Sequence, residues 1–184
     1  MTVAVREALP AEYAAIGEVT AAAYAIFPET ADDAGYTAEL RDVAGRASAC
    51  PIYVAVDEGS GRVIGGAMYV PGPGNPWAEV ERDGEAGIRM LAVTPEAQGR
   101  GAGSALVEAL LARARSDGRR GVVLLSTTSM TVAHRLYLRL GFRRQPDRDW
   151  EVEPGFVLIC FSRDLTTAGD PVSATTDART VAGA

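Results

Sequence analysis

The alternation of hydrophobic and polar positions along this chain predicts a series of short strands. Residues 3–8 alternate well enough to form a strand with one buried face. Residues 88–93 and 122–126 are nearly continuous apolar runs, as expected for strands buried on both faces. A turn, 58-EGSG-61, separates two further apolar segments and predicts a β-hairpin. The predicted strands are 3–8, 52–57, 62–70, 88–93, 122–126, 142–144 and 156–165.

Apolar side chains at helical spacing predict helices between these strands. The first helix begins after Leu9-Pro10, because proline suits the first turn of a helix. Two others carry apolar stripes over residues 40–47 and 106–114, and the last carries its stripe over 133–140. The resulting order, βααβββαβαββ, indicates a mixed α/β fold with a meander first and helical crossovers later.

Two segments lack this periodicity. Residues 71–85 are rich in proline and glycine and predict a long surface connection, of the kind that often lines a site. From Thr166 onward the residues are small and polar, so we expect 166–184 to be a disordered tail. Residues 1–165 would then form one compact domain.

Composition narrows the class of protein further. No apolar run approaches the roughly 20 residues that span a bilayer, so we expect a cytoplasmic protein that does not bind membranes. Two cysteines and one histidine are too few for a disulfide framework or a structural zinc centre. The net charge of −6 argues against general nucleic-acid binding and is compatible with a cationic substrate.

The stretch 98-QGRGAGSALVEALL-111 places glycines at 99, 101 and 103 directly before a predicted helix. Helix N-termini leave N–H groups unpaired and carry a partial positive charge, so they bind anions. Two phosphate-binding motifs do not fit here. The P-loop lysine is absent, and Ser104 or Leu106 stands where a dinucleotide fingerprint needs its third glycine. By itself, the segment could hold another anion or be a ligand-free loop.

The longer string 90-MLAVTPEAQGRGAGSALVEALL-111 resembles the signature of the GCN5-related N-acetyltransferases (GNAT), a strand followed by Q/R-x-x-G-x-G/A and a helix. The matching residues are Gln98, Gly101 and Gly103. About thirty residues later, 133–142 match the second family signature, A-x-x-L-Y-x-x-L-G-F, after a buried strand. The resemblance implies the GNAT fold, a mostly antiparallel α/β sheet with a splayed parallel pair and helices on both faces.

The resemblance also implies acetyl-CoA as the co-substrate, with no metal. The backbone N–H groups of Gly99 to Ser104 would hold its pyrophosphate, and the main chain of Leu91 to Val93 would pair with pantetheine as an added strand does. Arg100 reads equally well as a solvated surface charge. The cofactor-binding residues implied are Leu91, Ala92, Val93, Gln98, Gly99, Arg100, Gly101, Ala102, Gly103 and Ser104.

Acetyl transfer requires a deprotonated amine, a polarised thioester carbonyl and a protonated leaving thiolate. By resemblance, the Val93 N–H polarises the carbonyl and the Tyr137 phenol protonates the thiolate, although Tyr137 could also be only a core residue. Many relatives carry a glutamate where this chain has Ala86 and Gly87. Glu85 would share the face of Gly87, so it is a candidate base, directly or through a water.

Other polar residues leave alternatives open. Glu79 and Glu81 are further candidate bases, and His134 is expected on a helix surface. Trp150 and residues 71–77 could line the acceptor pocket or simply pack. Residues near the first two helices would form an acidic, aromatic rim suited to an amine: Tyr24, Phe27, Glu29, Asp32 and Asp33.

The function expected is acetyl transfer to a primary amine of a small molecule or peptide. This chain has glycine at position 87, where many relatives carry a glutamate. The alternative to an enzyme is therefore an acyl-CoA-binding sensor with little turnover. Many relatives are dimers, so a homodimer is an option that nothing in the sequence requires.

Overall fold

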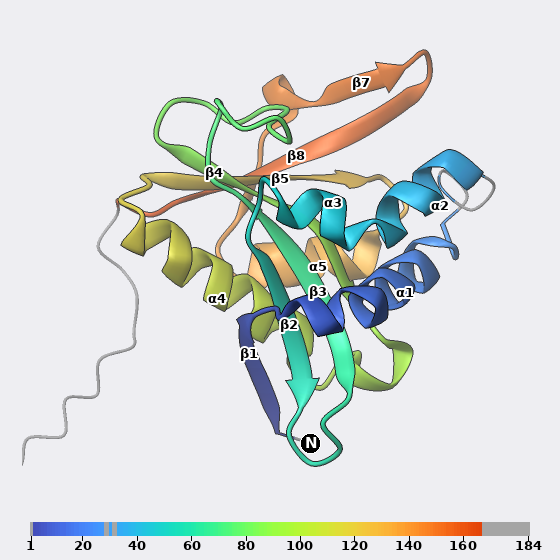
Figure 1. Ribbon diagram of the computed structural model, residues 1–184. Coiled ribbons are helices and arrows are strands. Elements are labelled where there is room, and N and C mark those ends of the chain that lie inside the picture. The colour runs from blue at the N-terminus through green and yellow to red at the C-terminus, as the bar shows by residue number, and fades with distance from the viewer. Residues whose placement is uncertain (1, 28–29, 31–32, 167–184) are drawn as a thin grey trace, which may run out of the picture.

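The computed structural model describes residues 2–27, 30 and 33–166 (Figure 1). The predicted tail after Thr166 lies outside this range, as do Glu29 and Asp32. The strands are β1 Val3–Glu7, β2 Ile52–Asp57, β3 Val63–Val70, β4 Glu85–Val93, β5 Gly121–Thr127, β6 Arg143–Arg144, β7 Trp150–Glu153 and β8 Phe156–Asp164. The helices are α1 Tyr13–Tyr24, α2 Ala34–Arg41, α3 Val43–Ala47, α4 Ala102–Ser116 and α5 Thr131–Arg139.

All the strands belong to one sheet of order β1-β2-β3-β4-β5-β8-β6, with β7 paired to β8. The pair β4–β5 is parallel, and the other pairs are antiparallel. The predicted mixed α/β fold with a parallel pair inside a mostly antiparallel sheet is therefore confirmed.

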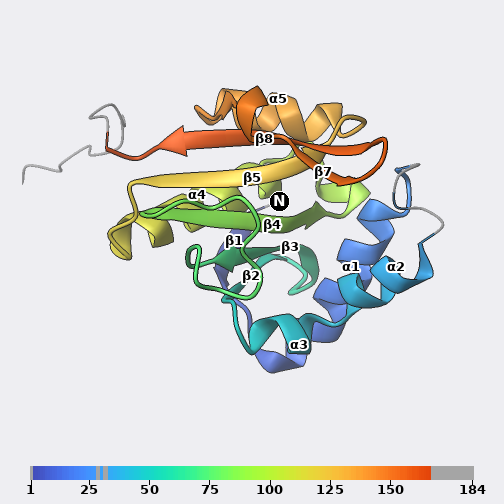
Figure 2. The same ribbon diagram turned by 90° about the horizontal axis from the view of Figure 1, so that it is seen from above.

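The helices cover both faces of the sheet. Side chains alternate along β3, so Met68 and Val70 pack in the cluster that contains Ile16 of α1, whereas Tyr69 packs in the cluster that contains Leu110 of α4. Helices α1, α2 and α3 gather together at one side of the sheet (Figures 1 and 2). Among the described helices, none is long and apolar enough to cross a membrane.

The parallel strands β4 and β5 separate after a short paired section. Pairing covers 85–88 with 121–124, and the remaining residues of β4 have no partner on β5. Just beyond this point β4 bulges, because Gly66 pairs with Ala92 and Met68 pairs with Arg89, which leaves two β4 residues opposite one on β3. One of them, Met90, has a φ of 51°. The bulge bends β4 away from β5 and opens a gap between the strand ends.

The structure differs from the sequence-based prediction in two elements. The second predicted helix is divided into α2 and α3 at Asp42, whose φ and ψ are −77° and 65°. The Asp42 side chain accepts a hydrogen bond from the Gly45 amide (2.9 Å), so a single residue ends one helix and caps the next. Strand β7, which is not among the predicted strands, forms a hairpin with β8.

Candidate functional site

Helix α4 begins with a glycine-capped turn that we call the glycine cradle, residues 99–104. Gly101 is the N-cap with a φ of 91°, and Gly99 has a φ of 71°. A Cβ atom at either position would meet no atom within 4 Å, so the space in front of this helix end is open. The first-turn amides of α4 and those of Gly99 and Gly101 have no backbone acceptor in the described part of the chain. Unpaired amides at a helix N-terminus are groups that attract anions.

Gly103 and Arg100 have roles that differ from those expected. A Cβ at Gly103 would lie 3.2 Å from Leu136 Cδ2, so this glycine allows α5 to pack closely against α4 and does not clear space for an anion. The Arg100 amide donates to the Ala97 carbonyl (3.3 Å), so it turns away from the cradle. The Arg100 and Gln98 side chains are exposed beside the cradle.

The end of β4 offers free main-chain groups to the gap. The Thr94 amide donates to the Ile64 carbonyl of β3 (2.9 Å). Because amides alternate sides along a strand, the Val93 amide points away from β3 and into the gap. The Ala92 main chain faces β3, so Ala92 does not offer the pairing groups that the sequence assigned to it.

Tyr137 of α5 is buried beside two aromatic rings, with centroids 6.0 Å from Phe142 and 5.7 Å from Phe161. Its hydroxyl has no hydrogen-bond partner among the described residues. The hydroxyl is also absent from the fully enclosed atoms without a partner, which in the described chain are Arg46 Nε and Arg119 Nε. Burial raises the Tyr137 pKa. The Tyr137 hydroxyl is therefore protonated and donates no hydrogen bond to any described protein atom.

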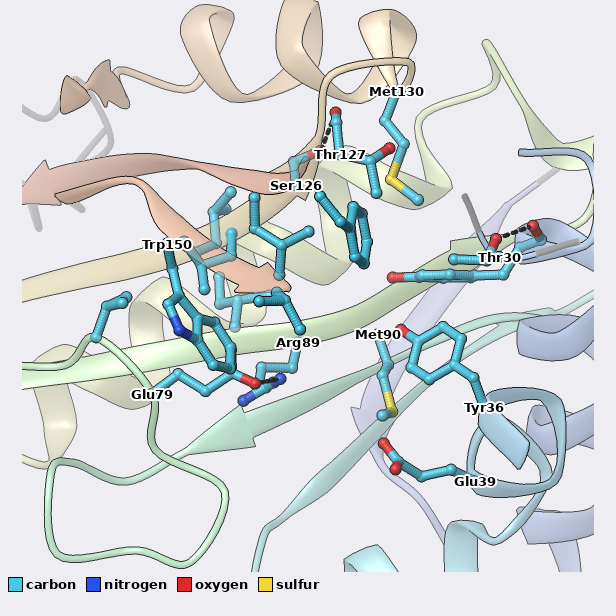
Figure 3. Close-up of a pocket in the computed structure, with 18 of the residues that line it drawn as sticks. Thr30, Tyr36, Glu39, Glu79, Arg89, Met90, Ser126, Thr127, Met130 and Trp150 are labelled. Atoms are coloured by element: carbon cyan, nitrogen blue, oxygen red, sulfur yellow. Dashed lines mark hydrogen bonds and ion pairs between the residues drawn. The ribbon is translucent and has the colours of Figure 1, made fainter. Parts of the chain in front are cut away.

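A cavity of about 330 Å³ lies at the parted strand ends (Figure 3). Its walls come from the middle of β4, the end of β5, helices α1 and α2, the loop 79–81 and the β7–β8 hairpin. Tyr24, Asp33 and Trp150 line it, in agreement with the sequence-based expectation. The connection 71–85 contributes residues 79–81 and not 71–77.

Carboxylates dominate the charge of this cavity, which we call the acidic cavity. The acidic lining residues are Asp33, Glu39, Glu79, Glu81 and Glu153. Arg89 is the basic lining residue, and its guanidinium forms an ion pair with Glu79 and donates to the Trp77 carbonyl (2.7 Å). Burial raises the pKa of Glu79.

Tyr24 and Tyr36 form the wall of the acidic cavity on the α1–α2 side. The two rings meet edge to face, with their centroids 6.1 Å apart. Burial raises the pKa of Tyr36 to about 12. Burial, and then the neighbouring phenols of Tyr36 and Tyr137, raise the pKa of Tyr24.

Glu85 is not positioned to act as the base. Arg148 donates to both carboxylate oxygens (2.9 and 2.6 Å), and the Arg82 amide donates to Oε2 (2.8 Å). Burial alone would raise the Glu85 pKa, but these donors outweigh it and leave the pKa below its ordinary value. The ion pair has a structural role, and Arg148 gave no sequence signal because it lies 63 residues away.

His134 is half-buried, not on the helix surface as expected. Its Nε2 lies 3.0 Å from the Thr127 carbonyl and 3.1 Å from Ser126 Oγ. The ring packs 5.2 Å from Phe161 between centroids, and burial lowers its pKa. Since the carbonyl only accepts, Nε2 carries the proton and cannot deprotonate Ser126. His134 fixes the end of β5, where Ser126 and Thr127 line the acidic cavity.

A helix start with a glycine cradle, next to a parted parallel strand pair, is the arrangement that the sequence resemblance implies. Residues 16–142 match the model of the Acetyltransferase (GNAT) family. The chain belongs to this family.

Individual relatives agree with this assignment. A mycothiol acetyltransferase of Arthrobacter sp. (strain FB24) is 40% identical over 93 residues, which are 50% of this chain and 27% of that protein. The chain thus spans about a quarter of that curated relative. A GNAT acetyltransferase from Staphylococcus aureus Mu50 has a TM-score of 0.69 at 12% identity, covering 89% of this chain and 99% of its own. The paia N-acetyltransferase from Thermoplasma acidophilum, solved with coenzyme A, has a TM-score of 0.66 at 12% identity, with the same coverage.

Proposed function

We propose that this protein is an N-acetyltransferase that moves an acetyl group from acetyl-CoA to a primary amine. The glycine cradle beside the parted ends of β4 and β5 carries this proposal. The open space in front of Gly99 and Gly101, together with the amides that lack acceptors, fits a pyrophosphate group. The Val93 amide and the adjoining unpaired edge of β4 fit the peptide-like pantetheine arm. The coenzyme A bound to the paia N-acetyltransferase supports the same ligand here.

The chain supplies the groups that acetyl transfer needs. Acetyl-CoA provides an activated thioester, and the Val93 amide is the donor for its carbonyl oxygen. The amine nitrogen forms a bond to the acetyl carbon as the carbon–sulfur bond breaks. The sulfur takes its proton from the Tyr137 hydroxyl, which burial keeps protonated at neutral pH. The amine gives up its own proton to a base.

The acceptor is a cationic amine. Its binding region is the acidic cavity, where five carboxylates face one guanidinium that is already paired with Glu79. A protonated amine compensates this excess of negative charge, whereas an anionic acceptor would be repelled. Lysine, spermidine, kanamycin and a peptide with a free N-terminus are suitable probes.

Release of the CoA thiol with each of these four amines tests the proposal, alongside calorimetry with acetyl-CoA. We expect micromolar acetyl-CoA binding and amine-dependent thiol release. Tight acetyl-CoA binding with no transfer to any amine would instead favour the acyl-CoA-binding sensor. Absence of acetyl-CoA binding would overturn both functions.

A further inference from the structure

Gly87 of β4 lies beneath a carboxylate from another segment. A Cβ atom built at Gly87 would lie 1.9 Å from Oε1 of Glu81 and 3.0 Å from its Cδ. No side chain larger than hydrogen fits here unless Glu81 moves. The Glu81 carboxylate therefore occupies the space in which a side chain at position 87 would begin. This is the last paired section of β4 before the strands part.

The loop holds this carboxylate by one oxygen and leaves the other available. Glu81 Oε2 accepts hydrogen bonds from the amides of Glu79 (2.6 Å) and Val80 (3.1 Å). Glu81 Oε1 has no hydrogen-bond partner among the described residues, and it is not one of the fully enclosed polar atoms. Because Glu81 lines the acidic cavity, Oε1 is a free acceptor on the acetyl-acceptor side of the sheet.

The other carboxylates near β4 are already engaged. Glu79 forms the ion pair with Arg89, and Glu85 is held at both oxygens by Arg148. Asp33 caps α2 by accepting from the Tyr36 amide (2.8 Å). Among the carboxylates that line the cavity, that of Glu81 lies against β4 at Gly87 and forms no ion pair in the described chain.

We infer that Glu81 is the general base of the proposed acetyl transfer, an assignment that rests on the proposed function. The loop 79–81 brings the carboxylate to the strand position that Gly87 leaves without a side chain. A proton of the acceptor ammonium passes to Glu81 Oε1, directly or through one water, and its bonding electron pair stays on nitrogen. That lone pair forms the bond to the acetyl carbon as the carbon–sulfur bond breaks and the sulfur takes the Tyr137 proton. The second proton on nitrogen then leaves to solvent, from which the Tyr137 phenol is reprotonated.

The pH profile of kcat/KM tests this role. It is measured with whichever of lysine, spermidine, kanamycin or the peptide the wild-type protein acetylates fastest. Glu81→Gln keeps an oxygen for the two loop amides, so we expect unchanged acetyl-CoA affinity and thermal stability. We expect kcat to fall about 100-fold and the acidic limb of the profile to disappear. Other groups near Glu81 also titrate or carry charge, namely Glu79, Arg89, Cys50 and Arg148. Glu79→Gln removes the neighbouring carboxylate and is therefore the matched control, which should keep the acidic limb of the profile.

A double-mutant cycle provides a second, independent measurement. Gly87 has an ordinary φ, so the backbone tolerates Gly87→Ala, and its methyl group should displace the Glu81 carboxylate. The methyl group would also lie 3.2 Å from Val70 Cβ, a packing cost that is the same in both backgrounds. Gly87→Ala should lower kcat at least tenfold in the wild-type background and have no further effect in a Glu81→Ala background.

Wild-type turnover and an intact acidic limb in Glu81→Gln would overturn the inference. Equal effects of Gly87→Ala in both backgrounds would also overturn it. Failure of the wild-type protein to acetylate any of the four amines would instead contradict the proposed function, so the two failures are distinguishable.

Discussion

The two halves of the site are built in different ways. The glycine cradle comes from one continuous stretch, 99–104, and presents main-chain amides to a helix end. The acidic cavity collects side chains from α1, α2, the loop 79–81, β4, β5 and the β7–β8 hairpin. Main-chain amides are the same whatever the side chains, so the ligand proposed for the cradle is a group that does not depend on side-chain identity. The acceptor proposed for the cavity would instead be selected by side chains that are particular to this chain.

Charge follows the same division. The cradle provides partial positive charge from a helix end without a fixed side-chain cation, whereas the cavity carries an excess of carboxylates. Substitutions in the cradle should therefore change acetyl-CoA binding, and substitutions in the cavity should change turnover or acceptor recognition.

The largest effect is expected at Gly101. Gly101→Val forces a β-branched residue into a left-handed conformation, which costs roughly 1–3 kcal/mol, and places a side chain in the anion site. We expect acetyl-CoA affinity to fall more than 100-fold by calorimetry. Gly118→Val is the matched control, because Gly118 follows the other end of α4, has a φ of 68° and also has open space around it. Both variants should lose similar stability, but the control should bind acetyl-CoA normally. Equal binding by the two would contradict the cradle.

The next effect is expected at Tyr137. Tyr137→Phe removes a hydroxyl that has no partner in the described chain, so the free energy of unfolding should change by less than about 0.5 kcal/mol. Turnover should fall about 100-fold in steady-state kinetics, with acetyl-CoA affinity unchanged. Tyr69→Phe is the control, because the Tyr69 hydroxyl donates to Asp117 (3.0 Å). It should lose about 1 kcal/mol of stability and keep its turnover. Full activity in Tyr137→Phe would leave Tyr137 as a core residue.

The sequence predicts the residues of the glycine cradle much better than those of the acidic cavity. Gln98, Gly101 and Gly103 lie in a local motif, and so does Tyr137, which makes them visible in sequence. The sequence predicts Gly103 as clearance for an anion, whereas in the structure it makes room for Leu136. That contact forms only when the chain folds, so the sequence does not reveal it. The same limit explains why Glu85 is wrongly predicted as a candidate base, because its partner Arg148 is 63 residues away in sequence and contacts it only in the folded chain.

Asp42 illustrates a local limit. The apolar stripe over 40–47 continues across the break, and Leu40 and Val43 are both buried as a single helix would require. The backbone angles of Asp42 and the capping hydrogen bond from Gly45 reveal two helices. Periodicity predicts which residues face the core, but it does not exclude a sharp change of direction between them.

The ion pair of Glu85 provides a stability test without a change in turnover. The side chains of Arg148 and Glu85 are only 6% and 19% exposed, so Glu85→Gln leaves a nearly buried cation uncompensated. We expect a loss of about 2–3 kcal/mol of unfolding free energy, measured by urea denaturation. Glu18→Gln is the control, because the Glu18–Arg41 pair is 68% and 52% exposed. It should cost less than about 0.5 kcal/mol.

The pH dependence of this stability has a definite sign. The folded-state pKa of Glu85 lies below its ordinary value of 4.5. Its contribution is therefore fully present above that value and is lost as the pH falls through the folded-state pKa. The stability difference between wild type and Glu85→Gln should shrink on acidification below pH 4.5. A difference that is constant over this range, or a matching loss of kcat at neutral pH, would contradict a structural role.

The smallest effect is expected at Glu39, on the α2 wall of the acidic cavity. Its carboxylate attracts the acceptor at long range without a direct part in proton transfer, so Glu39→Gln should raise KM for a cationic amine about threefold and leave kcat unchanged. The difference should shrink in 0.5 M salt, because exposed charges are screened at that ionic strength. Glu108→Gln makes the same charge change on the exposed surface of α4 and should leave KM unchanged. If both substitutions raise KM equally, the net charge of the protein attracts the amine, and the acidic cavity has no special part in acceptor recognition.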